Sequence, residues 1–374
     1  SEPYFLRIKE FPNSDLCIVT NNTNTNYNLD LCKFCNGIIF EKSTFNIIRF
    51  VNNKAIDNEL VVSDKFDFTK VKVLPSYEGT LVSVYKYNNV LNYSTKRALD
   101  ASRSKWNSSK SFKDLFLECW NYNNHEVDLN VYIEDNLCYN FIILHPENQN
   151  VIQYTEPKLV LINTRKFNTL EEVVIDELNS ENIIYLYNMY STFLSVNEFN
   201  EDFRLKESNP EYSKYEGVFL TDGYNTQKIE FRLFSEKKSI RPNSSNKFFS
   251  FLMLRKDATK LEQYTKLFPN EKLQLKNWEL EIMEFAKTIH ETYLSKHVYK
   301  TTQDIPVYLR TTVYKLHGLY LTTRNPIVLN TVYNHINMLN EKQLMSLYNK
   351  HSEFVALSAS SQPLDPVEDV VMAS

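Results

Sequence analysis

The sequence predicts an α+β protein in which a mainly β-stranded domain precedes a helical one. Up to about Leu254, runs of β-branched and aromatic residues alternate with turn residues, as in strands and hairpins. After about Asp257, apolar residues recur at helical spacing. The 374 residues are enough for two hydrophobic cores. We therefore expect a first domain over residues 1–256, a helical domain over 257–357 and a disordered acidic tail over 358–374.

Four runs in the first domain have the composition of strands. Residues 80–87 and 90–95 flank Asn88-Asn89, and this pattern predicts a hairpin. Residues 140–145 and 158–163 flank a link that starts at Pro146. We expect each pair of runs to form neighbouring strands.

Helices are expected where apolar residues repeat every three or four positions. In the first domain this pattern covers residues 111–120, and another helix is expected from Thr169, which has capping-box spacing to Glu172. Further on, Asn325-Pro326 is expected to start one helix and Asn340 the last one. The longest helix has one apolar face formed by Trp278, Ile282, Phe285, Ile289 and Tyr293.

Charge is distributed unevenly along the chain. The net charge is −4, but residues 247–350 contain 15 Lys and Arg against 9 Asp and Glu, a surplus of +6 that leaves about −10 elsewhere. A basic C-terminal part suits an anionic partner such as nucleic acid, and a solvated helical surface is the alternative. Five scattered cysteines and the lack of an apolar run of about 18 residues favour a reducing intracellular compartment and no membrane.

Glycine is rare, with only five in the chain, namely Gly37, Gly79, Gly217, Gly223 and Gly318. We expect each to mark a backbone position that a side chain would obstruct. Three of them lie in the short segments NGIIFE at 36–41, SYEGTL at 76–81 and EGV at 216–218. No P-loop or dinucleotide-binding glycine pattern is present.

In order and spacing, these segments resemble the adenylyltransferase domain of ATP-dependent RNA ligases, particularly the phage type that repairs tRNA. The family's nucleophile motif, Lys-x-Asp-Gly, is similar to SYEG at 76–79. The longest similarity covers residues 140–166, where a Pro-x-Asn-x-x-Val-x-x-Tyr pattern joins two strands. The resemblance spans about residues 30–256 and implies a nucleotidyltransferase fold with antiparallel sheets around a groove. The helical remainder is where this family keeps an RNA-specificity domain.

The resemblance also assigns candidate nucleotide-binding residues by position. Arg49 and Lys54 precede the nucleophile motif, Lys96 ends a Ser-Thr-Lys segment, and Lys247 is weakly matched to the second lysine of a fifth motif that precedes an aromatic strand. The full set of nucleotide-binding remnants is Glu78, Gly79, Arg49, Lys54, Lys96, Glu216 and Lys247. For the lysines the alternative is an ordinary surface position, and for Glu216 it is the end of a strand.

Three positions depart from the family pattern. Ser76 stands where the family has the lysine that attacks ATP, and a serine has no amine. Ile142 replaces a glutamate that contacts the ribose, and Ser245 replaces the first lysine of the fifth motif. Lys70 and Lys72 lie nearby, but they match the motif only after a shift in register. The sequence therefore predicts no catalytic residue at Ser76.

We conclude from the sequence that the chain is a catalytically degenerate RNA-ligase-like protein, a binding or structural module with no cofactor. Its Asn-, Lys- and Tyr-rich composition is compatible with a large DNA virus or phage, so RNA or other proteins of a viral assembly are the expected partners. One alternative is an active ligase that uses ATP and magnesium, with the lysine substituted or supplied elsewhere. Another is a viral assembly protein with no nucleic-acid role. No metal site is expected, because Cys32 and Cys35 lack a second ligand pair.

Overall fold

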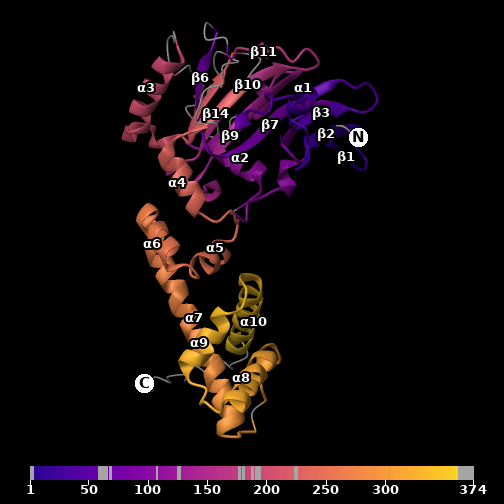
Figure 1. The fold of residues 1–374 in the computed structure, drawn as a ribbon. Coiled ribbons are helices and arrows are strands. Elements are labelled where there is room, and N and C mark those ends of the chain that lie inside the picture. Colours follow the sequence, from indigo (N-terminus) through magenta and orange to yellow (C-terminus); the bar gives the residue numbers. More distant parts are fainter. Residues whose placement is uncertain are drawn as a thin grey trace, which may run out of the picture. The chain divides into compact units, whose positions relative to one another are not determined.

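The computed structural model describes residues 4–57, 66, 70–106, 108–123, 128–175, 178, 182–186, 189, 195–222, 226–302 and 304–360. The chain divides into two compact units, Ser1–Ser239 and Ile240–Ser374 (Figure 1). All described strands lie in the first unit, and the second is helical. The predicted α+β class, with antiparallel sheets and a helical C-terminal part, is therefore confirmed.

The described strands of the first unit form three sheets. The N-terminal sheet has the order β1-β2-β3-β4, the central sheet β11-β10-β9-β7-β8 with β12 beside β10, and the third sheet β5-β14-β13-β6. Neighbouring strands are antiparallel except for the parallel pairs β10–β12 and β5–β14. The strands are β1 (Leu6–Glu10), β2 (Leu16–Asn21), β3 (Ile38–Glu41), β4 (Ile47–Arg49), β5 (Ile56–Asp57), β6 (Lys72–Ser76), β7 (Thr80–Tyr87), β8 (Val90–Thr95), β9 (Leu137–Leu144), β10 (Lys158–Lys166), β11 (Glu172–Val173), β12 (Ile183–Tyr185), β13 (Gly217–Thr221) and β14 (Thr226–Glu230).

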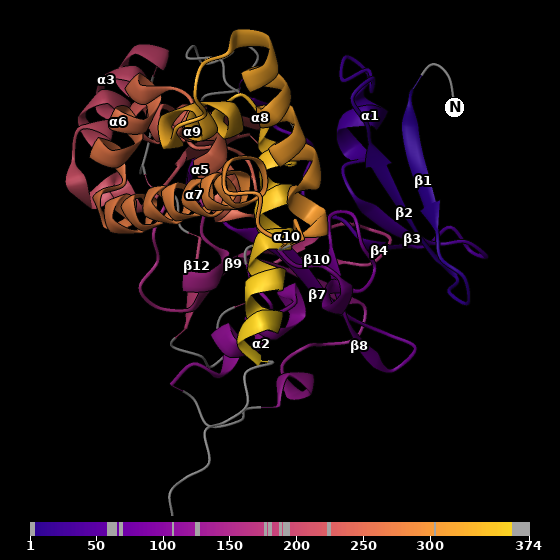
Figure 2. The same ribbon diagram turned by 90° about the horizontal axis from the view of Figure 1, so that it is seen from below.

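The helices of the first unit are short, and one of them, α2, packs on the central sheet. They are α1 (Asp30–Phe34), α2 (Phe112–Asn121), α3 (Val196–Glu207) and α4 (Arg232–Ile240), with single turns η1 (Ala101–Arg103), η2 (Leu129–Val131), η3 (Pro146–Asn148) and η4 (Pro210–Lys214). Helix α2 lies along β7, β9 and β10 (Figure 2). Leu115 and Phe116 of this helix are fully buried in the core that it shares with the sheet.

The predicted hairpin and the predicted helix at 111–120 are both confirmed. Asn88 and Asn89 both have positive φ, 52° and 59°, as a tight two-residue hairpin turn requires. Ser111 and Asp114 bond to each other's backbone and form a capping box at the start of α2. The strand runs around 140–145 and 158–163 are confirmed as β9 and β10.

The helix predicted from Thr169 was wrong. Asn168 and Leu170 have φ of 61° and 60°, which a right-handed helix cannot accommodate, and the chain instead enters strand β11. Helices α3 and α4 were not predicted, although Phe199 and Phe203 of α3 are buried four positions apart, as one face of a helix requires.

The second unit is a set of packed helices. They are α5 (Lys247–Leu254), α6 (Ala258–Leu267), α7 (Lys272–Tyr293), α8 (Arg310–Thr323), α9 (Leu329–Asn337) and α10 (Glu341–Ser360), with turns η5 (Pro269–Glu271) and η7 (Val307–Leu309) and a π-helical turn η6 (Leu294–Val298). The predicted apolar face of α7 is confirmed, since Ile282, Phe285, Ile289 and Tyr293 are buried. Asn340 and Gln343 bond reciprocally at the start of α10, as predicted.

Several predicted boundaries in the second unit need correction. The unit begins at Ile240, because α5 packs on α6, α7 and α10, so residues 240–256 do not belong to the first unit. Lys247 starts a helix, not the expected aromatic strand. Helix α9 begins at Leu329 after an extended Val328, so Asn325-Pro326 is not its cap. Helix α10 continues through Ser360, past the predicted tail boundary, and residues 361–374 lie outside the described part of the chain.

A chain of buried polar side chains ties the central sheet to the end of the N-terminal sheet. Arg49 Nε donates to Ser83 Oγ at 2.6 Å, and Ser83 donates to Asn140 Oδ1 at 2.6 Å. Asn140 Nδ2 in turn donates to Asn163 Oδ1 at 2.8 Å and to the Phe50 carbonyl at 3.1 Å. All four side chains are buried, so each bond depends on its neighbours for a partner.

We predict that Asn140→Ala lowers the free energy of unfolding by about 2–4 kcal/mol, because it leaves several buried polar groups without partners. The measurement is urea unfolding. Asn130→Ala is the matched control, since Asn130 is exposed and bonds only to nearby Asp128, and it should change stability by less than about 0.5 kcal/mol. Equal effects of the two substitutions would show that the buried polar chain adds nothing.

Candidate functional site

The segment that resembles the nucleophile motif joins two sheets. Ser76 ends β6 in the third sheet, Thr80 begins β7 in the central sheet, and residues 77–79 make the passage between them. Tyr77 is buried and packs edge-to-face on Tyr215, with ring centroids 5.0 Å apart. The passage is thus held in place where the chain changes sheets.

Two glycines are required at this junction for steric reasons. A Cβ on Gly79 would lie 2.4 Å from both Ile142 Cγ2 and the Ile143 carbonyl oxygen of β9. A Cβ on Gly217 would lie 2.0 Å from the Ile229 carbonyl oxygen of β14. The prediction that a side chain would obstruct the backbone is confirmed at both positions. Ile142, the apolar replacement noted in the sequence, lies against the motif glycine itself.

The Ser76 hydroxyl is buried and bonded to Glu216. The strand register places Ser76 opposite Gly217, and the backbone N–H of Glu216 donates to the Ser76 carbonyl at 2.9 Å. Ser76 Oγ donates to Glu216 Oε1 at 2.6 Å, and the serine side chain is 0% exposed. The structure therefore brings together two residues that lie 140 positions apart in the sequence and that the resemblance assigned to one site.

Lys228 completes the group. Its Nζ lies 2.7 Å from the same Glu216 Oε1 and 3.6 Å from Glu230 Oε1. Glu230 also binds Lys238 at 2.6 Å and accepts a hydrogen bond from Ser235 at 2.9 Å. Burial alone would raise the pKa of Glu230, but the hydrogen bonds from Lys238 and Ser235 outweigh it and hold the pKa below its usual value. The result is a chain of ion pairs from Glu216 through Lys228 and Glu230 to Lys238, with Ser76 bonded to Glu216 at its start.

The sequence analysis missed Lys228 and searched for this charge at 245–247. Lys228 and Glu230 are two residues apart on β14, so they lie on the same face of the sheet. The pair has the Lys-x-Lys spacing sought in the fifth motif, with glutamate in the second place. The signal was the alternation of buried Gln227 and Ile229 with charged residues directly after the Glu-Gly-Val strand.

Glu78 has a structural role in the passage between the sheets. Its Oε2 accepts the backbone N–H groups of Val151 and Ile152 at 2.8 and 2.6 Å. Tyr154 donates its hydroxyl proton to the Glu78 carbonyl at 2.5 Å, and Asn148 Nδ2 donates to Thr80 Oγ1 at 2.9 Å. The Asn, Val and Tyr of the pattern that joins β9 to β10 thus bind the motif turn directly.

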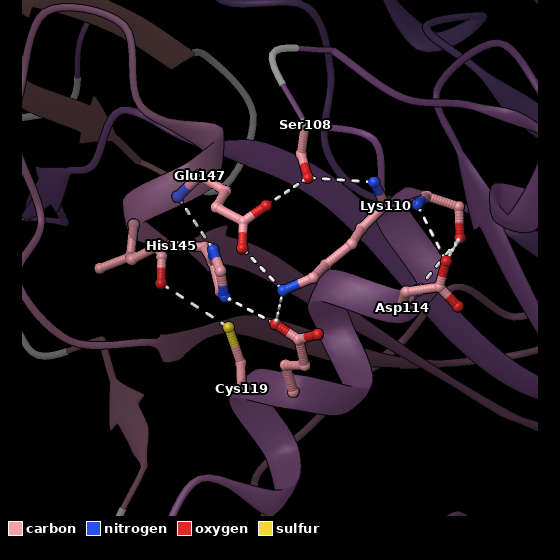
Figure 3. A network of polar contacts seen from close by, with 9 residues as sticks. Ser108, Lys110, Asp114, Cys119, His145 and Glu147 are labelled. Carbon is pink, nitrogen blue, oxygen red and sulfur yellow. Dashed lines mark hydrogen bonds and ion pairs between the residues drawn. The ribbon is translucent and has the colours of Figure 1, made fainter. Parts of the chain in front are cut away.

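A second polar network holds the same loop against α2 (Figure 3). His145 Nδ1 accepts the N–H of Glu147 at 3.0 Å, so its proton is on Nε2, which donates to Glu118 at 3.2 Å. Lys110 Nζ lies between Glu118 and Glu147, at 2.9 and 2.6 Å. Burial lowers the pKa of His145 even though the neighbouring carboxylates act in the opposite direction. His145 is therefore held neutral.

Two of the other predicted residues form a separate group at the edge between the N-terminal and central sheets. Arg49 is fully buried and donates Nη1 to the carbonyls of Gly37 and Thr95, at 2.8 and 3.1 Å. A Cβ on Gly37 would lie 3.0 Å from Lys96 Cγ, which places Lys96 beside it. Burial lowers the pKa of Arg49, whose bonds go to neutral groups. These contacts give Arg49 a structural role.

Lys54 and Lys247, the two remaining predicted lysines, have other surroundings. Lys54 Nζ is 5.2 Å from the centre of the Tyr27 ring, and its backbone N–H donates to the Lys33 carbonyl at 2.9 Å. Lys247 is the first residue of α5 in the second unit. A nucleotide-binding role for these lysines stays a prediction.

Three predictions concerned the cysteines, a metal site and the membrane. All five cysteines are free and buried. Within the described ranges, we find no cluster of three or more His, Cys, Asp or Glu side chains that could hold a metal ion. In the same part of the chain, no helix is long and apolar enough to cross a membrane.

Comparison with known proteins gives distant relatives. No protein-family model matches the chain. It is 23% identical over 283 residues to an "Immediate-early protein ICP-46 homolog" of Invertebrate iridescent virus 6, covering 71% of this chain and 59% of the relative. It is 25% identical over 259 residues to the homolog of Invertebrate iridescent virus 3, covering 68% and 55%. The chain thus spans a little more than half the length of these curated relatives.

Two solved structures show a weak likeness. An archaeal ATP-dependent RNA ligase is 13% identical, with a TM-score of 0.39, covering 68% of this chain and 70% of the other. A "Putative ATP-dependent DNA ligase" of Aquifex aeolicus is 12% identical, with a TM-score of 0.41, covering 85% and 78%.

We predict that Glu78→Ala destabilises the protein by about 1–3 kcal/mol, because two backbone N–H groups lose their acceptor. Glu78→Gln should recover most of this loss, since its amide oxygen can still accept. Thermal and urea unfolding measure both variants. An alanine variant as stable as the wild type would exclude the structural role of Glu78.

We predict that His145 makes stability depend on pH in a defined direction. Its pKa in the folded protein lies below the ordinary value of 6.5, so the unfolded chain binds the proton more readily. This contribution to stability is complete above pH 6.5 and is lost as pH falls toward the folded-state pKa. His145→Asn keeps an acceptor for the Glu147 N–H and should flatten the decline in urea midpoint. An unchanged pH dependence would contradict the prediction.

Proposed function

We propose that the chain is a catalytically degenerate relative of ATP-dependent RNA ligases, one that keeps the scaffold as an RNA-associated binding or assembly module of a virus. The observation that carries this proposal is the environment of Ser76, whose side chain is fully buried and bonded to Glu216. In ligase chemistry a lysine amine at this place attacks the α-phosphorus of ATP. A buried hydroxyl engaged with a carboxylate cannot replace that amine.

Glu216 does not make Ser76 a working nucleophile. A carboxylate beside a hydroxyl can in principle accept its proton. Here Glu216 Oε1 already accepts from both Ser76 and Lys228, at 2.6 and 2.7 Å. Attack by Ser76 would require these contacts to break and the main chain around β6 and β13 to open. The geometry favours a closed, structural group of side chains.

A second candidate function rests on Lys228. Its amine is bonded to the same carboxylate oxygen as Ser76, so it is a lysine that the fold, and not the motif, brings to the site. If it acted as the nucleophile, its ammonium would first pass one proton to Glu216, the free amine would bond to the α-phosphorus of ATP as pyrophosphate leaves, and the second proton lost from the nitrogen would go to solvent. Lys228 must first lose its contacts with Glu216 and Glu230. For this reason we favour the proposal that the chain is catalytically degenerate.

The viral part of the proposal is supported by the two relatives from invertebrate iridescent viruses. The RNA part is supported by the surplus of +6 charges over residues 247–350. A protein-only assembly role differs in one measurable respect, because binding to RNA through phosphate contacts weakens steeply as salt rises.

We predict that the protein forms no covalent adduct with ATP. The test is incubation with α-labelled ATP and magnesium, followed by denaturing electrophoresis beside an active RNA ligase. Label at stoichiometric yield would overturn the degenerate reading. Loss of that label in Lys228→Ala would then identify the second candidate, whereas its loss in Ser76→Ala would identify the serine. Ser76→Lys alone should also remain unlabelled, because Ile142 still replaces the ribose contact and Lys228 still occupies Glu216.

A further inference from the structure

One glycine has no steric reason to be a glycine. Gly37, Gly79 and Gly217 each lie where a Cβ would press on neighbouring atoms, and Gly223 lies outside the described residues. Gly318 differs, since a Cβ there would meet nothing within 4 Å. It lies in the middle of α8, where glycine weakens a helix relative to alanine. The prediction of an internal obstruction is thus wrong for Gly318, whose backbone is open to an external group.

The face of α8 around Gly318 carries aromatic rings. Tyr314 and Leu321 lie four and three residues from Gly318, so they share its side of the helix, whereas His317 lies on the adjacent side. The His317 ring stacks on His297 of the π-helical turn η6, with centroids 3.9 Å apart and planes at 11°. Tyr314 packs against the edge of His297 and is 55% exposed. Bare backbone therefore lies beside an exposed ring.

The charge of this region has one sign. Residues 305–340 contain no Asp or Glu. Lys315 lies three residues before Gly318 on α8, Arg324 is the residue that follows the end of this helix, and Lys296 precedes His297 in η6. None of these three cations forms an ion pair with another described residue. We call the surface formed by Lys296, Tyr314, Lys315, His317, Gly318 and Arg324 the α8 patch.

One exposed ring, three cations without ion pairs among the described residues and open backbone fit a particular class of ligand. Single-stranded nucleic acid offers flat bases for stacking and phosphates for ion pairing. A metal ion does not fit, because the nearly parallel planes of His297 and His317 keep their nitrogen lone pairs from converging on one point. An acidic protein would satisfy the cations but would have no need of an exposed ring beside bare backbone.

We propose that the α8 patch binds single-stranded nucleic acid, with a nucleotide packed on Gly318 beside Tyr314 and with phosphates held by Lys296, Lys315 and Arg324. This inference rests on the proposed function, because it assigns the RNA association of that proposal to one surface. It gives Gly318 the role that its surroundings within the protein do not supply.

The test is fluorescence anisotropy of the full chain with labelled oligo(U) of about ten nucleotides, with oligo(dT) and duplex RNA as separate arms. Tyr314→Ala should weaken binding of oligo(U) by about tenfold, and Tyr314→Phe should retain it, because stacking needs only the ring. Gly318→Ala should raise the melting temperature and at the same time weaken binding several-fold. Tighter binding of oligo(U) than of oligo(dT) would identify RNA as the ligand.

Lys260→Ala is the control, because Lys260 is an exposed lysine on α6 outside the patch, and it should bind like the wild type. Wild-type affinity in both Tyr314→Ala and Gly318→Ala would overturn the α8 patch and leave RNA association intact. Preference for duplex RNA would also overturn the patch. No binding by the wild type at about 50 mM salt would overturn the patch and the RNA part of the proposed function together.

Discussion

The close approach of the chain at Gly79 to strand β9 is the constraint on which the candidate site depends. The backbone there passes so near Ile142 and Ile143 that no side chain fits, and this passage carries the chain from the third sheet to the central one. Ser76 precedes the passage and so must end β6 opposite Gly217. Gly217, equally tight against β14, fixes Glu216 from the other side. The absence of a Cβ at Gly79 and at Gly217 therefore determines which side chains meet at the candidate site.

The charged side chains of the candidate site already neutralise one another. Ser76, Glu216, Lys228, Glu230 and Lys238 satisfy one another in sequence, and the two carboxylates are mostly shielded from solvent. A site built to bind phosphate presents cations without partners, whereas here a nucleotide would have to separate bonded charges. Removing one partner of a buried ion pair commonly costs about 3–5 kcal/mol. Ligand binding would have to exceed that cost before any chemistry began.

The sequence predicted those features of the fold that local physics controls. The Asn88-Asn89 turn, the amphipathic faces of α2 and α7, and the cap at Asn340 follow from short-range spacing. The helix predicted at Thr169 failed, because residues 167–171 form the turn between the paired strands β10 and β11, with positive φ at Asn168 and Leu170 and an Asn168 N–H that donates to the Ile47 carbonyl of β4. Ser76, Glu78, Gly79 and Glu216 were placed together by family resemblance. Lys228 was missed, since its partner Glu216 becomes a neighbour only through strand register.

Glu78 illustrates how an acid at a motif position can have a structural role. Its carboxylate holds two backbone amides of the loop before β10, and the tyrosine of that loop holds its carbonyl, so exchange of this acid would loosen two sheets at once. Selection for a folded protein alone would therefore retain the acid and the glycine. The presence of Glu78 and Gly79 in the motif therefore indicates the fold and not the chemistry. In proteins of this shape, the informative question is whether the residue two places earlier can still react.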